Sequence, residues 1–284
     1  MSKNYRAEIT GVFGDPVDGN PTGVMEEAAY AACGLNYRYL TLKVTAEDFP
    51  DAMKSIRALH MKGMNLTMPH KITVIPYLDE LSEAARIIGA VNTILVKDGK
   101  LYGENTDGKG FVQALENAGE SLSGKNITIL GAGGAAKAIA VECALAGAGS
   151  ITIINRTIER ALDLAEVIRT HTSTKSLSMK WEASQQIPAD TDILINATSI
   201  GLHPQCDQKP DIDYDTIRDS MVVTDVVFNP AQTLFLKEAA QRGAKTISGL
   251  GMLACQGALN FTLWTGTSAP LEVMEETLRK EFEL

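Results

Sequence analysis

The sequence predicts an α/β protein with two domains. Its 284 residues, 45% of them hydrophobic, suffice to bury two cores. Strand-like and helix-like stretches alternate over the first hundred residues, which is typical of an α/β domain. A second series follows Asn105-Thr106-Asp107-Gly108 and contains a strand, a glycine-rich turn, a helix and another strand. We therefore expect two α/β domains that join near this point.

The first series of elements is predicted by hydrophobic periodicity and turn residues. We expect strands at residues 8–13, 37–44, 63–67, 91–96 and 101–103. A helix over residues 24–32 ends before Gly34, and Met68-Pro69-His70-Lys71 opens another helix with proline near its first position. Asp98-Gly99 is a common two-residue turn pair, so the last two strands are expected to form a hairpin.

The second series begins with the apolar run Ile127-Thr128-Ile129-Leu130, which enters a glycine turn and then a helix. Gly131, Gly133 and Ala136 fit the G-x-G-x-x-G/A spacing of a dinucleotide-binding turn. The glycines allow a tight turn and a close approach of the backbone to a pyrophosphate, and the small third residue lets the helix pack near the strand. The strand, turn and helix around the motif make it more specific than its letters alone.

The end of the next strand indicates which dinucleotide binds. An NAD site usually carries Asp or Glu there, whereas this chain has Asn155-Arg156-Thr157 and, one helical turn later, Arg160. Guanidinium groups pair well with a 2′-phosphate, which a carboxylate would repel. The alternative is that both arginines form the solvated start of a helix. Because they fall where the ribose is expected, we favour NADP as the cofactor.

Later elements continue the pattern. We expect strands at residues 192–198 and 221–228 and helices at 251–266 and 270–282. Ligands of open α/β sheets bind at the carboxyl ends of strands, so Asn196-Ala197-Thr198 and Phe228-Asn229-Pro230 are candidate cofactor residues. Ordinary turn chemistry explains each of these strand ends equally well. Gln256 is the one conspicuous polar side chain of the apolar helix.

The bulk composition narrows the possible partners. A net charge of −9 leaves no basic excess for nucleic acid, and no run approaches the roughly 18 apolar residues of a membrane span. The N-terminus has no signal-peptide core, so we expect a cytoplasmic enzyme. The four cysteines are scattered singly and the four histidines lack metal-ligand spacing. Neither a disulfide framework nor a metal site is therefore expected.

A nicotinamide enzyme needs a proton carrier at the alcohol or carbonyl oxygen that reacts. Lys71 and Asp107 are the candidates. A desolvated lysine whose ammonium group is oriented by a carboxylate can give or take the proton of a secondary alcohol. On composition alone, either residue is more often a surface charge.

Six motifs run along the whole chain. They are Asn65-x-Thr67-x-Pro69-x-Lys71, Gly89-Ala90-Val91-Asn92-Thr93, Asn105-Thr106-Asp107-Gly108, Gly131-Ala132-Gly133-Gly134-Ala135, Asn155-Arg156-Thr157, and Gly251-Met252-Leu253 with Gln256. In order and spacing the chain resembles the shikimate dehydrogenase family. The resemblance implies NADPH-dependent reduction of 3-dehydroshikimate to shikimate, in the pathway to chorismate and the aromatic amino acids. It also implies a substrate domain of residues 1–106, completed by helices in residues 252–284, that faces a Rossmann-type NADP-binding domain of residues 107–251 across a cleft.

By this resemblance, Lys71 is the catalytic acid/base and Asp107 its partner. The expected substrate-binding residues are Asn20, Thr22, Thr67, Asn92, Asp107 and Gln256. The expected cofactor-binding residues are Gly131, Ala132, Gly133, Gly134, Ala135, Asn155, Arg156, Thr157, Arg160, Thr198, Val227, Phe228, Gly249 and Met252. The substrate is a small molecule, and we expect the protein to be a monomer or a homodimer.

One loop departs from the family pattern. After the first strand the family usually has a Ser-x-Ser pair that holds the substrate carboxylate, whereas this chain has Asn20-Pro21-Thr22, with Gly19 in place of a frequent His. Thr22 still offers a hydroxyl and Asn20 an amide N–H. Phe228 stands where many members have Tyr. These departures leave quinate or a related cyclohexane acid as an alternative substrate.

Two further readings are a regulator from a different class of protein and another kind of dehydrogenase. A ligand-binding regulator would keep the fold without catalysis, but the retention of both Lys71 and Asp107 argues against it. Without the family resemblance, a folate-type or amino-acid dehydrogenase with the same two-domain plan also fits, because a fold alone does not determine function.

Overall fold

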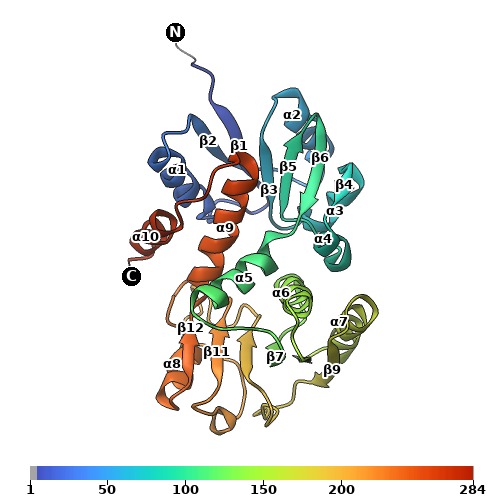
Figure 1. The fold of residues 1–284 in the computed structure, drawn as a ribbon, viewed down its shortest axis with the longest axis vertical. Helices are drawn as coiled ribbons and strands as arrows, with labels where there is room; N and C mark the ends of the chain where they lie inside the picture. Colours follow the sequence, from blue (N-terminus) through green and yellow to red (C-terminus); the bar gives the residue numbers. More distant parts are fainter. Residues whose placement is uncertain (1–4, 284) are drawn as a thin grey trace. The chain divides into compact units, whose positions relative to one another are not determined.

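The computed structural model describes residues 5–283, and the chain divides into two compact units. The first unit joins the chain up to Thr106 with the chain from Ala254 onward, and the second is the continuous segment Asp107–Leu253. In Figure 1 the first unit comprises the blue-to-green segments together with most of helix α9 (Gly249–Thr265) and helix α10 (Leu271–Glu281), drawn in red. Within residues 5–283, no helix combines the length and the apolar character needed to cross a membrane.

The first unit contains a six-stranded mixed sheet in the order β2-β1-β3-β5-β6-β4. Its strands are β1 (Glu8–Gly14), β2 (Tyr37–Lys43), β3 (Gly63–Leu66), β4 (Glu80–Leu81), β5 (Thr93–Lys97) and β6 (Lys100–Glu104). β1 runs parallel to β2 and β3, whereas β5 runs antiparallel to β3 and β6. The carboxyl ends of β1, β3 and β6 therefore lie at the same edge as the start of β5. Five of these strands lie where the sequence predicted them.

The β5–β6 hairpin has the geometry that its turn residues predict. Lys97 pairs with Lys100, and Asp98 and Gly99 between them have φ angles of 52° and 77°. Positive φ at both central residues is the requirement of a type I′ turn, which glycine and aspartate tolerate better than other residues. The hairpin prediction is confirmed.

Helices cover the first sheet and close its core. They are α1 (Thr22–Ala32), α2 (Phe49–Ala58), α3 (His70–Thr73), the 3-10 turn η1 (Ile75–Tyr77), α4 (Glu83–Ile88), α9 and α10. Tyr30 of α1 stacks on Phe261 of α9 with ring centroids 5.4 Å apart. Trp264 of α9 donates from Nε1 to the carbonyl oxygen of Ile94 at 2.9 Å. The late helix α9 is therefore an integral part of the early sheet.

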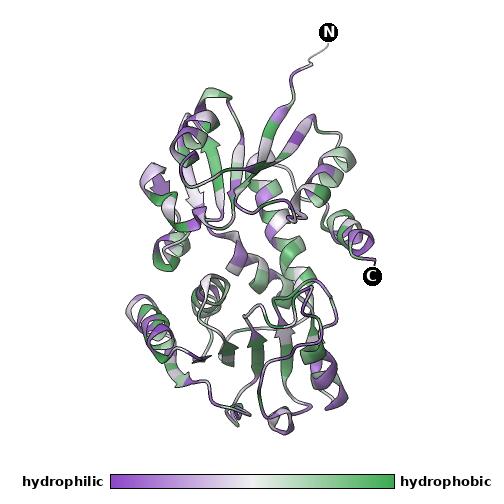
Figure 2. Cartoon of the chain, turned by 180° about the vertical axis from the view of Figure 1, so that it is seen from behind, coloured by the Kyte–Doolittle hydropathy of each residue, from purple (hydrophilic) through white to green (hydrophobic). Residues whose placement is uncertain are grey.

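The second unit contains a parallel six-stranded sheet in the order β12-β11-β10-β7-β8-β9. Its strands are β7 (Asn126–Leu130), β8 (Ser150–Asn155), β9 (Lys175–Lys180), β10 (Ile193–Asn196), β11 (Val222–Asp225) and β12 (Lys245–Ile247). Its helices are α5 (Thr106–Asn117), α6 (Gly134–Leu145), α7 (Ile158–His171), α8 (Leu234–Gln241) and the 3-10 turn η2 (Tyr214–Thr216). Hydrophobic residues dominate the inner strands β7, β8, β10 and β11, because both faces of the sheet are covered there, and Figure 2 shows this apolar centre. The order reverses on either side of β7, which is the doubly wound pattern of a dinucleotide-binding fold.

Local contacts set two element boundaries near and within the second unit. Helix α5 begins at Thr106 and includes Gly108, although glycine is a poor helix former. Gly108 is needed there because a Cβ at this position would lie 2.3 Å from the carbonyl oxygen of Ala138 on α6. Strand β11 ends at Asp225 rather than at residue 228. The backbone N–H of Val227 donates to the Asp225 carboxylate and is therefore not available for a hydrogen bond within the sheet.

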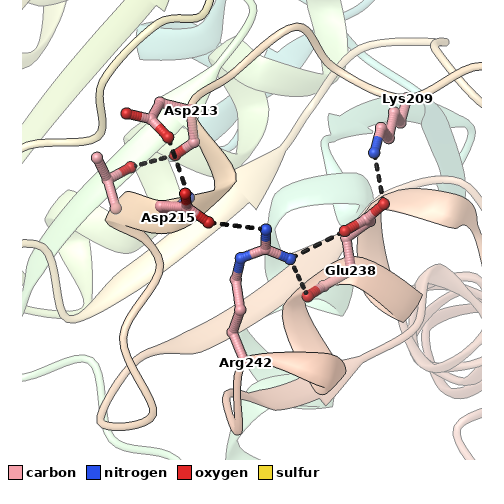
Figure 3. A network of polar contacts seen from close by, with 6 residues as sticks. Lys209, Asp213, Asp215, Glu238 and Arg242 are labelled. Atoms are coloured by element: carbon pink, nitrogen blue, oxygen red, sulfur yellow. Dashed lines mark hydrogen bonds and ion pairs between the residues drawn. The ribbon is translucent and has the colours of Figure 1, made fainter.

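An ion-pair network fastens the loop before β11 to α8, as Figure 3 shows. Arg242 donates to Asp215 at 3.0 Å and to Glu238 at 2.9 Å, and Lys209 also contacts Glu238. Both cations lie over the ring of Tyr214. Every one of these charges is at least partly exposed to solvent, so each pair contributes little free energy. Their geometric effect is to hold α8 against the strand ends next to it.

Candidate functional site

The predicted substrate residues other than Asp107 gather around one edge of the first-unit sheet. Thr67 follows β3, Asn92 precedes β5, and both lie at the edge where the two antiparallel strands meet. The backbone N–H of Leu66 donates to the carbonyl oxygen of Asn92 at 2.7 Å. The N–H of Val91 donates to the carbonyl oxygen of Lys71 at 2.8 Å. Residues 66–71 and residues 91–92, two stretches that are separate in the sequence, are thereby tied together by backbone hydrogen bonds.

Lys71 lies in α3, a single helical turn that is held in place by the preceding residue, His70. The imidazole Nε2 of His70 lies 2.7 Å from the carbonyl oxygen of Val44, and its ring stacks on Phe49 with centroids 4.2 Å apart. His70 is almost fully buried, whereas Lys71 is half-buried. The buried histidine thus anchors a turn whose next side chain remains accessible.

The loop with Asn20-Pro21-Thr22, which differs from the family pattern, follows β1 and also reaches this edge. Asn20 Oδ1 accepts the backbone N–H of Thr22 at 3.0 Å, just where α1 begins. Because its oxygen is used in this way, Asn20 presents its Nδ2 amide as a donor. Thr22 is nearly buried, and its hydroxyl lies close enough to that of Tyr39 to lower the pKa of this phenol. Burial acts in the opposite direction and is the larger effect on Tyr39.

A buried polar network lies directly behind these residues. Its members are Asn65, Asn92, Thr93, Thr106, Gln256 and Asn260, each less than a tenth exposed. Gln256 and Asn260 lie one turn apart on α9, and the amide of Asn260 donates to Gln256 Oε1 at 3.1 Å. Gln256 is therefore not the one conspicuous polar side chain of this helix. The i, i+4 spacing to Gln256 is the sequence signal that Asn260 faces the same way.

Asp107 lies at the boundary between the two units. It is the first residue of the second unit and belongs to the first turn of α5. The preceding backbone is fixed, since the N–H of Thr106 donates to Asn92 Oδ1 at 2.7 Å. Asp107 is half-buried.

The glycine turn of the second unit has the geometry that a pyrophosphate requires. Gly131 adopts φ +110°, and a Cβ there would lie 3.0 Å from the carbonyl oxygen of Ala197. A Cβ at Gly133 or Gly134 would meet nothing within 4 Å, so the space in front of α6 is open. Ala136 is fully buried against the sheet, as its small size predicts. The N-terminus of α6 thus fits a bound dinucleotide phosphate.

The end of β8 presents two arginines to solvent. Asn155 Nδ2 donates to the carbonyl oxygen of Thr157 at 2.8 Å, which shapes the turn into α7. Arg156 and Arg160 are exposed, and neither forms an ion pair with another residue of the range 5–283. Both guanidinium groups therefore suit an anion such as a 2′-phosphate.

The ends of β10 and β11 are joined by a buried carboxylate. Asp225 accepts hydrogen bonds from Asn196 Nδ2 at 3.0 Å, from the Thr233 hydroxyl at 2.8 Å and from the Val227 N–H at 3.0 Å. Burial raises the pKa of Asp225 to about 6, although these hydrogen bonds oppose the shift. The network fixes the backbone at Val227 and, through Asn196 Oδ1, the Thr198 hydroxyl at 2.7 Å.

The remaining predicted cofactor residues lie in the same unit. Phe228 is half-buried after β11, Gly249 begins α9, and Met252 packs against the core of the second sheet. All fourteen predicted cofactor residues therefore belong to the segment Asp107–Leu253. Lys71, which is predicted to be catalytic, and the predicted substrate residues other than Asp107 belong to the first unit.

Glu26 is a polar residue of this region that the sequence did not identify as buried. It lies on α1 one turn after Thr22 and is fully buried. Neither of its carboxylate oxygens has a hydrogen bond of regular geometry within the described chain, although the Tyr30 hydroxyl lies near. Burial raises the pKa of Glu26 well above its usual range, and Tyr30 offsets only part of this effect.

We expect Glu26→Gln to become more stable relative to the wild type as the pH rises from about 5 to about 8. A carboxyl with a raised pKa holds its proton longer when folded than when unfolded, so it makes folding less favourable with rising pH above about 4.3. One such proton accounts for at most about 1.4 kcal/mol per pH unit. Urea unfolding at several pH values measures this, with the exposed Glu47→Gln as control. A difference that is constant with pH would contradict the expectation.

Three family models match successive parts of the chain. The shikimate dehydrogenase substrate binding domain matches residues 12–94. The shikimate / quinate 5-dehydrogenase model matches residues 113–206, and the shikimate 5'-dehydrogenase C-terminal domain matches residues 249–279. The matches follow the order of the two units and of the returning helices.

Individual relatives cover almost the whole chain. A protein of Desulforamulus reducens named shikimate dehydrogenase (NADP(+)) is 43% identical over 98% of this chain and 97% of its own length. The ligand-free 5-ketofructose reductase of Gluconobacter sp. strain CHM43 is 44% identical with a TM-score of 0.95, over 98% of this chain and 100% of that one. Shikimate 5-dehydrogenase of Thermus thermophilus, in complex with NADP(H) and shikimate, is 35% identical with a TM-score of 0.84. The match covers 96% of this chain and 99% of that one.

These similarities extend over both units, at identities well above the level at which only a fold is shared. They agree with the motifs that occur along the sequence from Asn65 to Gln256. The chain belongs to the shikimate dehydrogenase family.

Proposed function

We propose that this protein catalyses the NADP-dependent interconversion of 3-dehydroshikimate and shikimate, as an oxidoreductase acting on a secondary alcohol. One observation carries the proposal: Thr67, Lys71 and Asn92 gather at one sheet edge in a chain that belongs to the shikimate dehydrogenase family. The relatives from Desulforamulus reducens and Thermus thermophilus have names that give the same activity.

Substrate recognition is assigned to the first unit. Thr67, Asn92 and Gln256 offer one hydroxyl and two amides to the hydroxyl groups of the substrate. Asn20 Nδ2 and the Thr22 hydroxyl donate hydrogen bonds to the substrate carboxylate, in place of the family's Ser-x-Ser pair. The backbone hydrogen bonds among these loops support this role because they keep the side chains in place before the substrate arrives.

NADP recognition is assigned to the second unit. The segment from Gly131 to Ala135 holds the pyrophosphate at the N-terminus of α6, where the space is open. Arg156 and Arg160 pair with the 2′-phosphate, and Asn155 and Thr157 shape the turn that carries them. Residues Thr198, Val227, Phe228, Gly249 and Met252 are assigned to the rest of the cofactor. The NADP(H) complex of the Thermus thermophilus relative supports this choice of cofactor.

Proton transfer is assigned to Lys71. Bound NADPH supplies the hydride for the carbonyl carbon. The Lys71 ammonium group gives its proton from Nζ to the carbonyl oxygen, which becomes the hydroxyl, and Nζ takes the proton back in the oxidative direction. Asp107 orients the ammonium group and also binds a substrate hydroxyl. Its position is supported by the fixed backbone of Thr106 immediately before it.

A second candidate function is the reduction of 5-ketofructose. Two observations favour it. They are the similarity to the Gluconobacter reductase and the composition of the loop Asn20-Pro21-Thr22. Asn20 and Thr22 stand where the family usually has the Ser-x-Ser pair that holds a substrate carboxylate. A ketose is neutral and brings no carboxylate to this position.

A steady-state assay of the purified protein tests both candidates. Shikimate and quinate are each offered with NADP and with NAD, and 5-ketofructose is offered with NADPH and with NADH. The absorbance of the reduced nicotinamide gives kcat/KM for each pair. We expect the highest value with shikimate and NADP.

Other results assign the function differently. A value for 5-ketofructose more than about tenfold above that for shikimate would select the second candidate. A preference for quinate would place the enzyme on a related cyclohexane acid. Turnover of none of the three, with NADP binding intact, would overturn both candidates.

A further inference from the structure

Helix α9 carries two buried amide side chains, of which only Gln256 has so far been given a role. Asn260 lies one turn later, is fully buried, and donates from Nδ2 to Gln256 Oε1 at 3.1 Å. The two ends of an asparagine amide differ in hydrogen-bonding character, so its orientation decides which end of Gln256 faces away from it. Backbone groups of the network fix that orientation.

The first fixed point is a backbone N–H, which can only donate. The N–H of Thr106 donates to Asn92 Oδ1 at 2.7 Å, so the Nδ2 end of Asn92 is the donor that lies 3.0 Å from the Thr106 hydroxyl. Because the Thr106 hydroxyl oxygen accepts from Asn92, its own proton is available for Asn260. It donates to Asn260 Oδ1 at 2.8 Å.

The second fixed point is a backbone carbonyl, which can only accept. Asn65 Nδ2 donates to the carbonyl oxygen of Asn92 at 3.2 Å and to the Thr93 hydroxyl at 3.0 Å. The Thr93 hydroxyl in turn donates to Asn260 Oδ1 at 2.8 Å. Two independent hydroxyl protons therefore converge on the same oxygen of Asn260.

The reversed amide is disfavoured by the same distances. If Asn260 turned its Nδ2 toward the threonines, the proton of one threonine would have to point to the other's hydroxyl, 3.1 Å away, or to Asn92 Oδ1, and the remaining proton would be left with Asn92 Oδ1. These contacts are longer, at 3.1 and 3.2 Å, and that oxygen already accepts the Thr106 N–H. Asn260 thus keeps Oδ1 toward the threonines and Nδ2 toward Gln256.

We infer that Asn260 is a positioning residue that holds Gln256 with its Nε2 amino group, and not its Oε1 oxygen, toward the substrate. Gln256 then acts as a hydrogen-bond donor to a substrate oxygen. The inference rests on the proposed function in one respect, since the contact between Gln256 and the substrate is part of that proposal. Asn260 itself acts only through Gln256.

The variant that tests the orientation is Asn260→Asp. It keeps the shape of the side chain, and its carboxylate still accepts from both threonines. It can no longer donate to Gln256 Oε1, so the Gln256 amide is expected to rotate and donate to Asp instead. We expect the KM for the substrate selected by the assay above to rise about tenfold, the loss of one hydrogen bond, while the KM for NADP stays within about twofold.

A double-mutant cycle with Gln256→Ala separates positioning from a structural role. In the Gln256→Ala background, Asn260→Asp is expected to change the KM for the substrate by less than about twofold. An equal effect in both backgrounds would overturn the inference while leaving the proposed function intact. If Gln256→Ala alone left the KM for the substrate unchanged, Gln256 would not contact the substrate, and the inference would be wrong. Thr262→Val on the exposed side of the same helix is the matched control.

A spectroscopic measurement needs no turnover. The side-chain amide resonance of Gln256 in ¹⁵N-labelled protein is identified by its loss in Gln256→Ala. In Asn260→Asp we expect this resonance to shift and its exchange with solvent to slow, because the Nε2 protons then face the buried carboxylate. An unchanged resonance would overturn the inference whichever substrate the protein uses.

Discussion

Replacing Lys71 by alanine is expected to lower kcat about a thousandfold, because the reacting oxygen then has no positioned acid/base. The KM for NADP should change by less than about threefold, since the predicted cofactor residues belong to the second unit. Steady-state kinetics in both directions measures kcat, and fluorescence quenching by NADPH gives cofactor binding independently of turnover.

The hairpin of the first unit offers a control for this variant. Lys100 lies at the end of the hairpin opposite to Asn92 and forms an ion pair with Glu80. Lys100→Ala removes the same charge and should leave kcat unchanged. If Lys71→Ala kept kcat within a few-fold of the wild type, the assignment of the proton to Lys71 would be wrong.

Replacing Arg156 by aspartate is expected to raise the KM for NADP about a hundredfold and to change the KM for NAD by less than about threefold. The variant removes a charge-assisted hydrogen bond and sets a carboxylate against the 2′-phosphate, while NAD has only a hydroxyl there. Because no residue of the described chain pairs with Arg156, the substitution breaks no internal ion pair. Kinetics with both cofactors at saturating substrate measures the change.

Arg169, on the helix α7 that follows Arg156, provides the comparison. It forms an ion pair with Glu166 and donates to the carbonyl oxygen of Ser176, so it serves the packing of α7 on β9. Arg169→Asp should reduce stability and leave the ratio of the two KM values unchanged. Equal effects of Arg156→Asp on NADP and NAD would exclude the 2′-phosphate role.

Elements with a strong local signal were predicted well from the sequence. The hairpin at Asp98-Gly99 and the turn at Gly131 both need positive φ angles, which few residues tolerate, so the residue type alone identifies the geometry. Strand β9 has no such signal. Its sequence Lys-Ser-Leu-Ser-Met-Lys is largely polar, and Leu177 is exposed on this edge strand. It forms because β8 offers a ladder, which is a tertiary effect that the segment itself does not encode.

The residues of the candidate site that belong to sequence motifs were predictable. The residues whose role depends on their burial in the folded chain were not. The residues from Asn65 to Lys71 and the turn at Gly131 belong to motifs whose spacing is visible in the sequence. Glu26 and Asn260 belong to none of the motifs. A glutamate on a helix is nearly always solvated, and only the packing of α1 shows that Glu26 is enclosed. The role of Asn260 depends on hydroxyls that lie more than 150 residues away in the chain.

The packing of α9 against the first sheet has a consequence for the order in which the protein acquires its structure during synthesis. The second unit is contiguous, so it can fold once its last strand has left the ribosome. The first unit cannot, because Trp264 and Asn260 complete hydrogen bonds to Ile94, Thr93 and Thr106 that were translated long before. Until α9 has been made, these polar groups lack their partners and the apolar surface that α9 covers is exposed, which is the condition under which nascent chains are prone to aggregate.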